Sequence, residues 1–133
     1  MRVVFDTNVF ISAFVIPGGN AEDAYLHAVR GTFELFSSVA ILTETANTLR
    51  RKFEWSDENV QRLLQSISKT ATVLKTRPHL HILKDDPDNR ILECALLADA
   101  NIIVSGDRHL LSLTRHRDVA IVKLADFLGL LKY

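Results

Sequence analysis

The stretch Val3-Val4-Phe5-Asp6-Thr7-Asn8-Val9-Phe10 decides the fold of this chain. Three apolar, strand-favouring residues run directly into Asp6, and a helical spacing of apolar residues begins at Val9. The pattern predicts a buried strand over 3–5 that ends at a carboxylate, followed at once by a helix over 9–15. Ligands of open parallel sheets bind outside the carboxyl ends of the strands. We therefore expect Asp6 at a functional edge of the sheet.

The rest of the chain alternates predicted strands with predicted helices, separated by turn-forming residues such as Pro17-Gly18-Gly19-Asn20. Apolar runs predict further strands over 33–37, 71–74, 101–105 and 119–122. Helical spacing predicts helices over 21–29, 39–53, 58–68, 108–113 and 123–131, and one from the acidic stretch 85–88 to about 99. Strands that alternate with helices predict an α/β fold with a mostly parallel sheet of about five strands.

Length and composition point to one ordinary globular domain over residues 1–133. A chain of 133 residues buries a sufficient core without disulfides. Its formal net charge is zero, so any contact with nucleic acid needs a local basic patch. The single cysteine, Cys94, excludes an intramolecular disulfide and favours a reducing compartment. With neither a targeting pattern nor a membrane span in the sequence, we expect a soluble, cytoplasmic protein.

Four acidic residues are expected at the same edge of the sheet. Asp6 follows the first strand, and Asp107 follows the strand over 101–105. Asp88 lies in the first turn of its helix, and the first turns of the helices lie at that edge too. Glu44 lies ~9 Å along its helix from the capping residue Ser38. Helical side chains tilt toward the N-terminus, so Glu44 reaches back toward the other three acids.

Each acid also has a simpler structural explanation. Asp6 and Asp107 could cap the helices that follow them, Asp88 could favour the positive end of its helix, and Glu44 could lie on a solvated face. Taken together, the four carboxylates are harder to explain in this way. At ~4–6 Å apart they repel by several kcal/mol per pair at an effective dielectric near 20. A hard divalent cation with oxygen ligands offsets such repulsion.

These motifs, in this order, resemble the PIN-domain family, and most closely its VapC-like toxins of type II toxin–antitoxin systems. The resemblance rests on Asp6-Thr7-Asn8-Val9 after a strand, an acid early in the third helix, Asp88-x-x-Ile91, and Ile103-Val104-Ser105-Gly106-Asp107. It implies a three-layer α/β/α fold. It also implies a metal-dependent endoribonuclease that cleaves single-stranded RNA, is restrained by a cognate antitoxin and forms a homodimer.

The resemblance also implies roles for individual residues. It assigns the acidic quartet to Asp6, Glu44, Asp88 and Asp107, with Asp85 as an alternative for the third acid. Asn8 and Ser105 match polar positions that support the metal or the attacking water. Mg²⁺, or Mn²⁺ in its place, held by such carboxylates lowers the pKa of a bound water and clamps the phosphate for in-line displacement.

Other candidate residues are fewer. Arg108 and His109 directly follow Asp107 and could meet substrate phosphates at the rim of the site. The pair His79-x-His81 lacks further ligands for a metal and is more typical of a surface. Cys94 falls on an apolar helix face, which favours a place in the core.

Two other functions compete with the ribonuclease. A haloacid-dehalogenase-like phosphatase also places an aspartate after the first strand, but it needs a second acid two residues later, where this chain has Asn8. A non-catalytic PIN module that binds RNA or protein would keep the fold without the reaction. The presence of all four acids disfavours that module.

Overall fold

A six-stranded sheet forms the middle layer of the molecule, in the order β3-β2-β1-β4-β6-β5. The computed structural model describes residues 1–131. The strands are β1 (Arg2–Phe5), β2 (Glu34–Ser38), β3 (Thr72–Leu74), β4 (Ile102–Val104), β5 (Arg115–His116) and β6 (Val119–Val122). All neighbouring pairs are parallel except β5 and β6, which pair antiparallel. The mostly parallel sheet is confirmed, with β5 as one strand more than the five expected.

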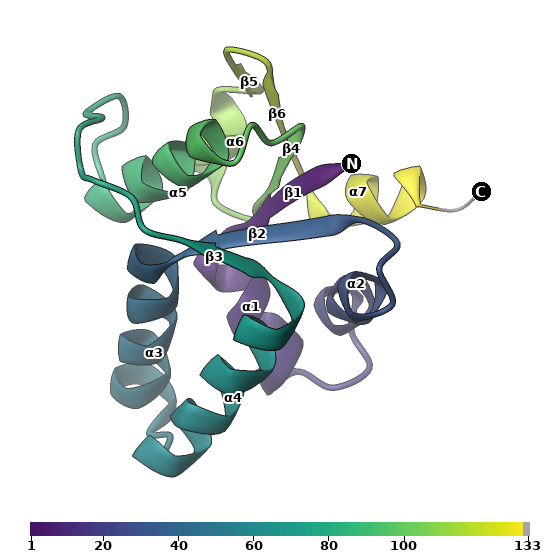
Figure 1. Cartoon of the computed structure of the whole chain (residues 1–133), viewed down its shortest axis with the longest axis vertical. Coiled ribbons are helices and arrows are strands. Elements are labelled where there is room, and N and C mark those ends of the chain that lie inside the picture. Colours follow the sequence, from purple (N-terminus) through teal and green to yellow (C-terminus); the bar gives the residue numbers. More distant parts are fainter. Residues whose placement is uncertain (132–133) are drawn as a thin grey trace.

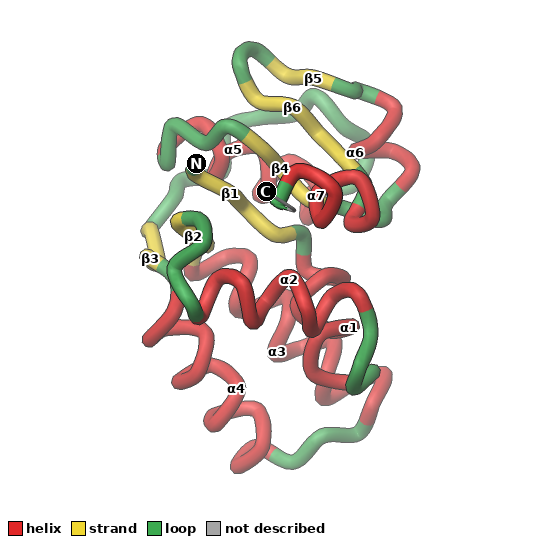
Figure 2. Tube along the Cα trace, turned by 90° about the vertical axis from the view of Figure 1, so that its right-hand side faces the viewer, coloured by secondary structure: helices red, strands yellow, loops and turns green. Residues whose placement is uncertain are grey.

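Helices cover both faces of this sheet. They are α1 (Thr7–Val15), α2 (Asn20–Val29), α3 (Val39–Phe53), α4 (Asp57–Thr70), α5 (Asp86–Leu97), α6 (Arg108–Ser112) and α7 (Leu124–Leu130). Figure 2 shows α1 to α4 gathered on one side of the sheet. After β3 the chain crosses back over β2 and β1 to reach β4, and this reversal places α5 and α6 on the other side (Figure 1). The three-layer α/β/α arrangement is thereby confirmed.

The first strand lies at the centre of the core. Val3, Val4 and Phe5 are fully buried, as expected for a strand covered on both faces. The ring of Phe5 meets that of Phe127 of α7 edge-on, with 6.2 Å between centroids. The central strand is therefore held rigidly, and so is the position of Asp6 at its end.

Several helix boundaries differ from the sequence prediction by one or two residues, among them the start of α1 and the end of α5. Helix α1 begins at Thr7, two residues early, so that Asp6 occupies its N-cap position. Helix α5 ends at Leu97, two residues short of the expected end, because Asp99 adopts a left-handed conformation with φ 52°. No helix within residues 1–131 combines the length and the apolar composition needed to cross a bilayer.

The segment 75–84, which connects β3 to the N-cap residue of α5, is held down by two buried polar side chains of that helix. Asn89 accepts hydrogen bonds from the backbone of Ile82 (3.1 Å) and Leu83 (2.9 Å). Glu93 accepts from the backbone of His79 (2.6 Å) and Leu80 (2.8 Å). These bonds satisfy backbone groups that neither a helix nor a strand satisfies. They also fix the segment that leads into the acidic stretch 85–88.

The Glu93 carboxylate stays charged although it is buried. Burial acts to raise the pKa of Glu93, but the backbone N–H groups of His79 and Leu80 and the charge of Arg90 outweigh it and hold the pKa below its ordinary value. The guanidinium Nε of Arg90 lies 2.6 Å from Oε1 of Glu93. One face of α5 is thus anchored by a buried ion pair.

Candidate active site

One cleft at the carboxyl-end edge of the sheet brings the predicted acids together. The cleft has a volume of about 470 Å³. Its walls include all four acids of the predicted quartet, namely Asp6, Glu44, Asp88 and Asp107. Asn8, Asp85 and Asp86 also line it. The four elements that carry the quartet are far apart in the sequence, so the convergence is a property of the fold.

Asp6 occupies the N-cap position of α1 without acting as a cap. Its side chain makes no capping hydrogen bond. Instead, Oδ2 accepts a hydrogen bond of 2.7 Å from the hydroxyl of Ser105, and the residue is only 5% exposed. Burial raises the pKa of Asp6, the Ser105 hydroxyl and the backbone N–H of Thr7 oppose this effect, and the charge of Asp107 adds to it. The simple capping explanation therefore fails for Asp6.

Ser105 connects the ends of β1 and β4. Its hydroxyl donates to Asp6 and accepts from the backbone N–H of Asp107 at 2.9 Å. Oδ1 of Asp107 accepts in turn from the backbone N–H groups of His109 (2.7 Å) and Leu110 (3.3 Å) at the start of α6. Asp107 is thus a helix cap through one oxygen and also a wall of the cleft.

Asp88 is the most perturbed acid of the cleft. It is 6% exposed, and its buried Oδ2 has no hydrogen-bond partner within the described part of the chain. Burial raises the pKa of Asp88 to about 6, and the charges of Asp107, Asp6 and Asp85 contribute in that order. A positive charge on His109 acts in the opposite direction. A buried, partnerless carboxylate among other carboxylates is costly unless a cation joins it.

Glu44 and Asp85 are more exposed members of the same cleft. Oε1 of Glu44 receives the hydroxyl of Thr48 at 3.4 Å and lies 3.9 Å from the guanidinium of Arg51. Asp85 is exposed in the N-cap position of α5 and makes no side-chain capping bond. Because Asp88 is buried and partnerless whereas Asp85 is solvated, the geometry favours Asp88 as the third acid.

The donor set fits a hard divalent cation, which prefers carboxylate oxygens. The partnerless oxygen of Asp88 and the repulsion between Asp88, Asp6 and Asp107 are features that a cation would relieve. Within residues 1–131, no three acidic, histidine or cysteine side chains are grouped closely enough to hold one ion. At least some of these carboxylates therefore have to turn before three of them can share one ion.

Two lysines of the cleft were not among the site residues predicted from the sequence. Lys52 and Lys84 line the cleft, and neither forms an ion pair within the described residues. The spacing of Lys52 could have identified it as a cleft residue. Glu44, Thr48 and Lys52 follow one another at four-residue intervals and therefore share one face of α3. The signal for Lys84 is its place directly before the acidic stretch. Both side chains are free to meet an anionic ligand.

The residues predicted to contact substrate lie farther out. Arg108 and His109 are exposed on α6, and neither lines the cleft. His79 and His81 are exposed as well, and Nδ1 of His79 bonds to the backbone oxygen of Arg77. Cys94 is buried in the core, as predicted, and burial raises the pKa of its thiol to about 12.

Comparisons with known proteins agree with this architecture. The model of the PIN-domain family matches residues 2–109. MJ1680, an uncharacterized protein of Methanocaldococcus jannaschii, is 27% identical over 117 residues, which cover 85% of this chain and 75% of the relative.

Three solved structures are similar in fold. VapBC2 from Rickettsia felis, solved with a DNA fragment from its promoter, has a TM-score of 0.64 at 14% identity, over 92% of this chain and 98% of the other. FitAB bound to the IR36 DNA fragment has a TM-score of 0.61 at 17% identity, over 92% and 94%. PAE2754 from Pyrobaculum aerophilum has a TM-score of 0.63 at 17% identity, over 98% and 88%.

Proposed function

This chain belongs to the PIN-domain family, and from that premise we propose that it is a metal-dependent endoribonuclease that cleaves single-stranded RNA. One observation supports the proposal above all others. Asp6 and Asp88 are buried in one cleft with Glu44 and Asp107, and the pKa values of both buried acids are raised. Perturbed carboxylates that share a cleft are typical of catalytic sites. We propose that residues 1–133 act as a single domain.

The roles of the acids follow from their environments. Asp6, Glu44, Asp88 and Asp107 would hold Mg²⁺, or Mn²⁺ in its place. A divalent cation bound there supplies a water of lowered pKa and neutralises charge on the phosphate. The buried residues, Asp6 and Asp88, provide fixed ligands because their surroundings do not let them turn freely.

Other residues of the site orient the acids and the substrate. The Ser105 hydroxyl fixes the rotamer of Asp6 by its 2.7 Å hydrogen bond. The amide of Asn8 lies in the wall of the cleft, where it can orient the attacking water. The ammonium groups of Lys52 and Lys84 are available for the phosphate oxygens of the strand. No side-chain nucleophile is required.

We further propose that the protein acts as the toxin of a toxin–antitoxin pair in the cytoplasm, as a homodimer restrained by a cognate antitoxin. The similarity in fold to the chains of VapBC2 and FitAB supports this proposal. The phosphatase is disfavoured, because Asn8 replaces the acid that its chemistry needs and because the matching family is a different one. A cleavage assay separates the ribonuclease from the non-catalytic module.

The decisive experiment is a cleavage assay on defined single-stranded RNAs with Mg²⁺ or Mn²⁺. We expect Asp6→Asn to reduce cleavage below detection because it removes a ligand at the centre of the cleft. The variant should remain folded, as judged by its melting temperature. Asp126→Asn is the matched control, since this acid is exposed on α7 and away from the cleft.

Three outcomes test the role of Asp6, the catalytic activity and the binding of metal separately. Undiminished cleavage by the Asp6→Asn protein would remove Asp6 from the site. RNA binding without cleavage by the natural sequence, in both metals, would favour the non-catalytic module. A melting temperature that rises with Mg²⁺ in the natural protein, and falls back with EDTA, reports metal binding independently of turnover.

A further inference from the structure

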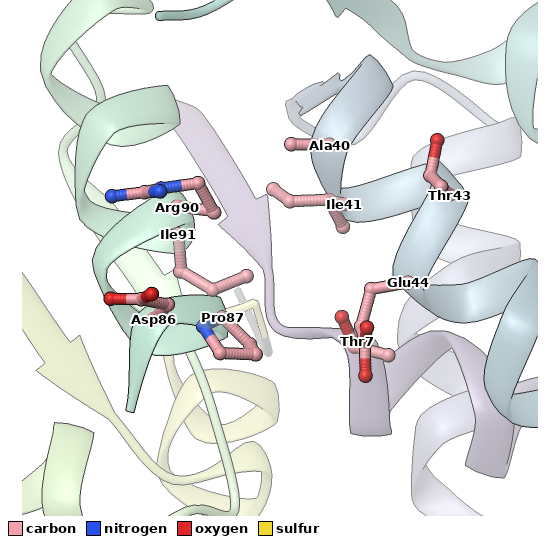
Figure 3. Close-up of a pocket in the computed structure, with 9 residues that line it drawn as sticks. All are labelled: Thr7, Ala40, Ile41, Thr43, Glu44, Asp86, Pro87, Arg90 and Ile91. Atoms are coloured by element: carbon pink, nitrogen blue, oxygen red, sulfur yellow. The ribbon is translucent and has the colours of Figure 1, made fainter. Parts of the chain in front are cut away.

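A second cavity opens beside the acidic cleft, between the first turns of α3 and α5 (Figure 3). Its volume is about 330 Å³. It shares part of its wall with the cleft, because Thr7, Glu44, Asp86 and Pro87 line both. We call this cavity the α3–α5 slot. Anything bound in the slot lies directly beside anything bound in the cleft.

The interior of the slot is apolar and rigid. Ile41 of α3 and Ile91 of α5 face each other across it, and Ala40 and Pro87 extend the apolar surface (Figure 3). Ile41 and Ile91 are each only 1% exposed, so they belong to the packed core and form a fixed floor. The slot is therefore preformed rather than opened by a ligand.

The cationic residue of the slot does not point into it. The guanidinium of Arg90 is directed away from α3 (Figure 3) and bonds to the backbone oxygen of Leu80 at 3.1 Å and to Glu93 at 3.0 Å. Arg90 lines the slot with the aliphatic part of its side chain. The slot consequently does not suit a phosphate group, in contrast to the lysine-bearing cleft beside it.

We propose that the α3–α5 slot receives one nucleobase of the RNA strand, next to the phosphodiester that lies in the acidic cleft. The proposal rests on the ribonuclease function proposed above and adds a base-binding subsite to it. Proteins that bind single-stranded RNA splay bases out of the strand, and enzymes that extrude a base hold it between aromatic or apolar side chains. A flat base with two apolar faces fits a slot with an apolar floor, whereas its charged backbone fits the cleft.

The polar groups of the slot favour some bases over others. They include the carboxylates of Glu44 and Asp86, which only accept hydrogen bonds, and the hydroxyls of Thr7 and Thr43. Acceptors therefore outnumber donors. Adenine, cytosine and guanine each present an exocyclic amino group, with two N–H donors, to such acceptors, whereas uracil has no amino group and presents only its single N3–H between two carbonyl oxygens. The slot is accordingly selective against uracil.

The test fills the slot without touching an acid. Ala40→Leu adds three carbon atoms at the half-buried lip of the slot and keeps a good helix former on α3. Ala125→Leu makes the same change at an exposed position of α7 and is the matched control. Both proteins and the natural sequence are assayed with Mg²⁺ on an RNA pool of random sequence, and the cut sites are mapped.

We expect the natural protein and Ala125→Leu to disfavour uracil at one position beside the cut. Ala40→Leu should raise KM at least tenfold and lose that preference, while its melting temperature still rises with Mg²⁺ as in the natural protein. An Ala40→Leu protein with an unchanged KM and an unchanged base preference would overturn the proposal.

A binding measurement separates this proposal from the nuclease function. Adenosine and uridine 5′-monophosphates are titrated into the natural protein in EDTA, with the methyl groups of Ile41 and Ile91 observed by NMR. We expect both methyl signals to shift with adenosine monophosphate at concentrations at which uridine monophosphate has no effect. Signals that do not move with either nucleotide would overturn the base subsite even if RNA is cleaved. Signals that shift in a protein without nuclease activity would uphold the subsite and reject only the enzyme.

Discussion

Removing the charge of Asp88 should stabilise the metal-free protein, although aspartate lies at a position normally favourable for an acid. The pKa of Asp88 is raised from the ordinary value of 3.8 to about 6 by burial and by its acidic neighbours. At about 1.4 kcal/mol per pKa unit, keeping this group ionised at neutral pH costs roughly 3 kcal/mol. Asp88→Asn removes that cost but still buries a polar amide, so we expect a gain of roughly 1–3 kcal/mol.

The gain has a defined dependence on pH. Asp88 loses its proton near pH 3.8 in the unfolded chain and near pH 6 in the folded one. Between these values the folded state binds more protons, so the stability of the natural protein falls as the pH rises. Asp6, whose pKa is also raised by burial, acts in the same direction. The advantage of Asp88→Asn should therefore be absent below about pH 4 and complete above about pH 6.

Urea denaturation in EDTA, at pH 4 and at pH 7.5, measures the free energy of unfolding of the natural protein and of Asp88→Asn. At roughly 3 °C per kcal/mol for a chain of this size, the melting temperature at pH 7.5 should rise by roughly 3–9 °C. Asp86→Asn is the matched control, because that acid also lies in the first turn of α5 but is exposed. Asp88→Asn could prove no more stable than the natural protein at pH 7.5, or could gain as much stability at pH 4 as at pH 7.5. Either result would show that ionised Asp88 does not destabilise the folded state.

Two further substitutions test the supports of the site. Ser105→Ala should lower metal-dependent RNA cleavage by roughly 10–100-fold, because the Ser105 hydroxyl orients Asp6, and kinetics on a defined RNA measure the loss. Glu93→Gln should cost roughly 3–5 kcal/mol in urea unfolding, because it leaves the charge of the half-buried Arg90 without its partner. Glu58→Gln, which breaks an exposed ion pair on α4, should cost less than about 1 kcal/mol.

The predictions for Ser105 and Glu93 are each contradicted by a different result. Ser105→Thr keeps a hydroxyl at the end of β4, so it should recover most of the cleavage that Ser105→Ala loses. Failure of this rescue would mean that the hydroxyl itself does not orient Asp6. If Glu93→Gln and Glu58→Gln cost the same, the ion pair on α5 does not anchor the segment 75–84.

The sequence predicts the cleft well where local rules decide the position of a residue. Asp6 and Asp107 follow strands, and Asp88 opens a helix, so each position is fixed by its own element. Glu44 depends in addition on a side-chain rotamer, and in the structure its carboxylate turns to Thr48 and not to the other acids. The two lysines of the cleft required knowledge of which helix faces meet, which periodicity alone does not contain.

Two other features could not be predicted from the sequence, because they depend on contacts between elements of the fold. Strand β5 has only Arg115 and His116, which form no apolar alternation, so it exists only because β6 offers a free edge. Asn89 and Glu93 look like a solvated helix face in the sequence. They are buried because the segment 75–84 folds over them, and that contact is tertiary.

The hydrogen bond between Ser105 and Asp6 joins residues that are 99 positions apart. During synthesis the ribosome releases Asp6 well before the strand that pairs beside it and the hydroxyl that orients it. A nascent chain, or a product truncated before β4, consequently has the first acid without the edge that makes it useful. Translation thus delays the assembly of this edge of the sheet until β4 and Ser105 have left the ribosome.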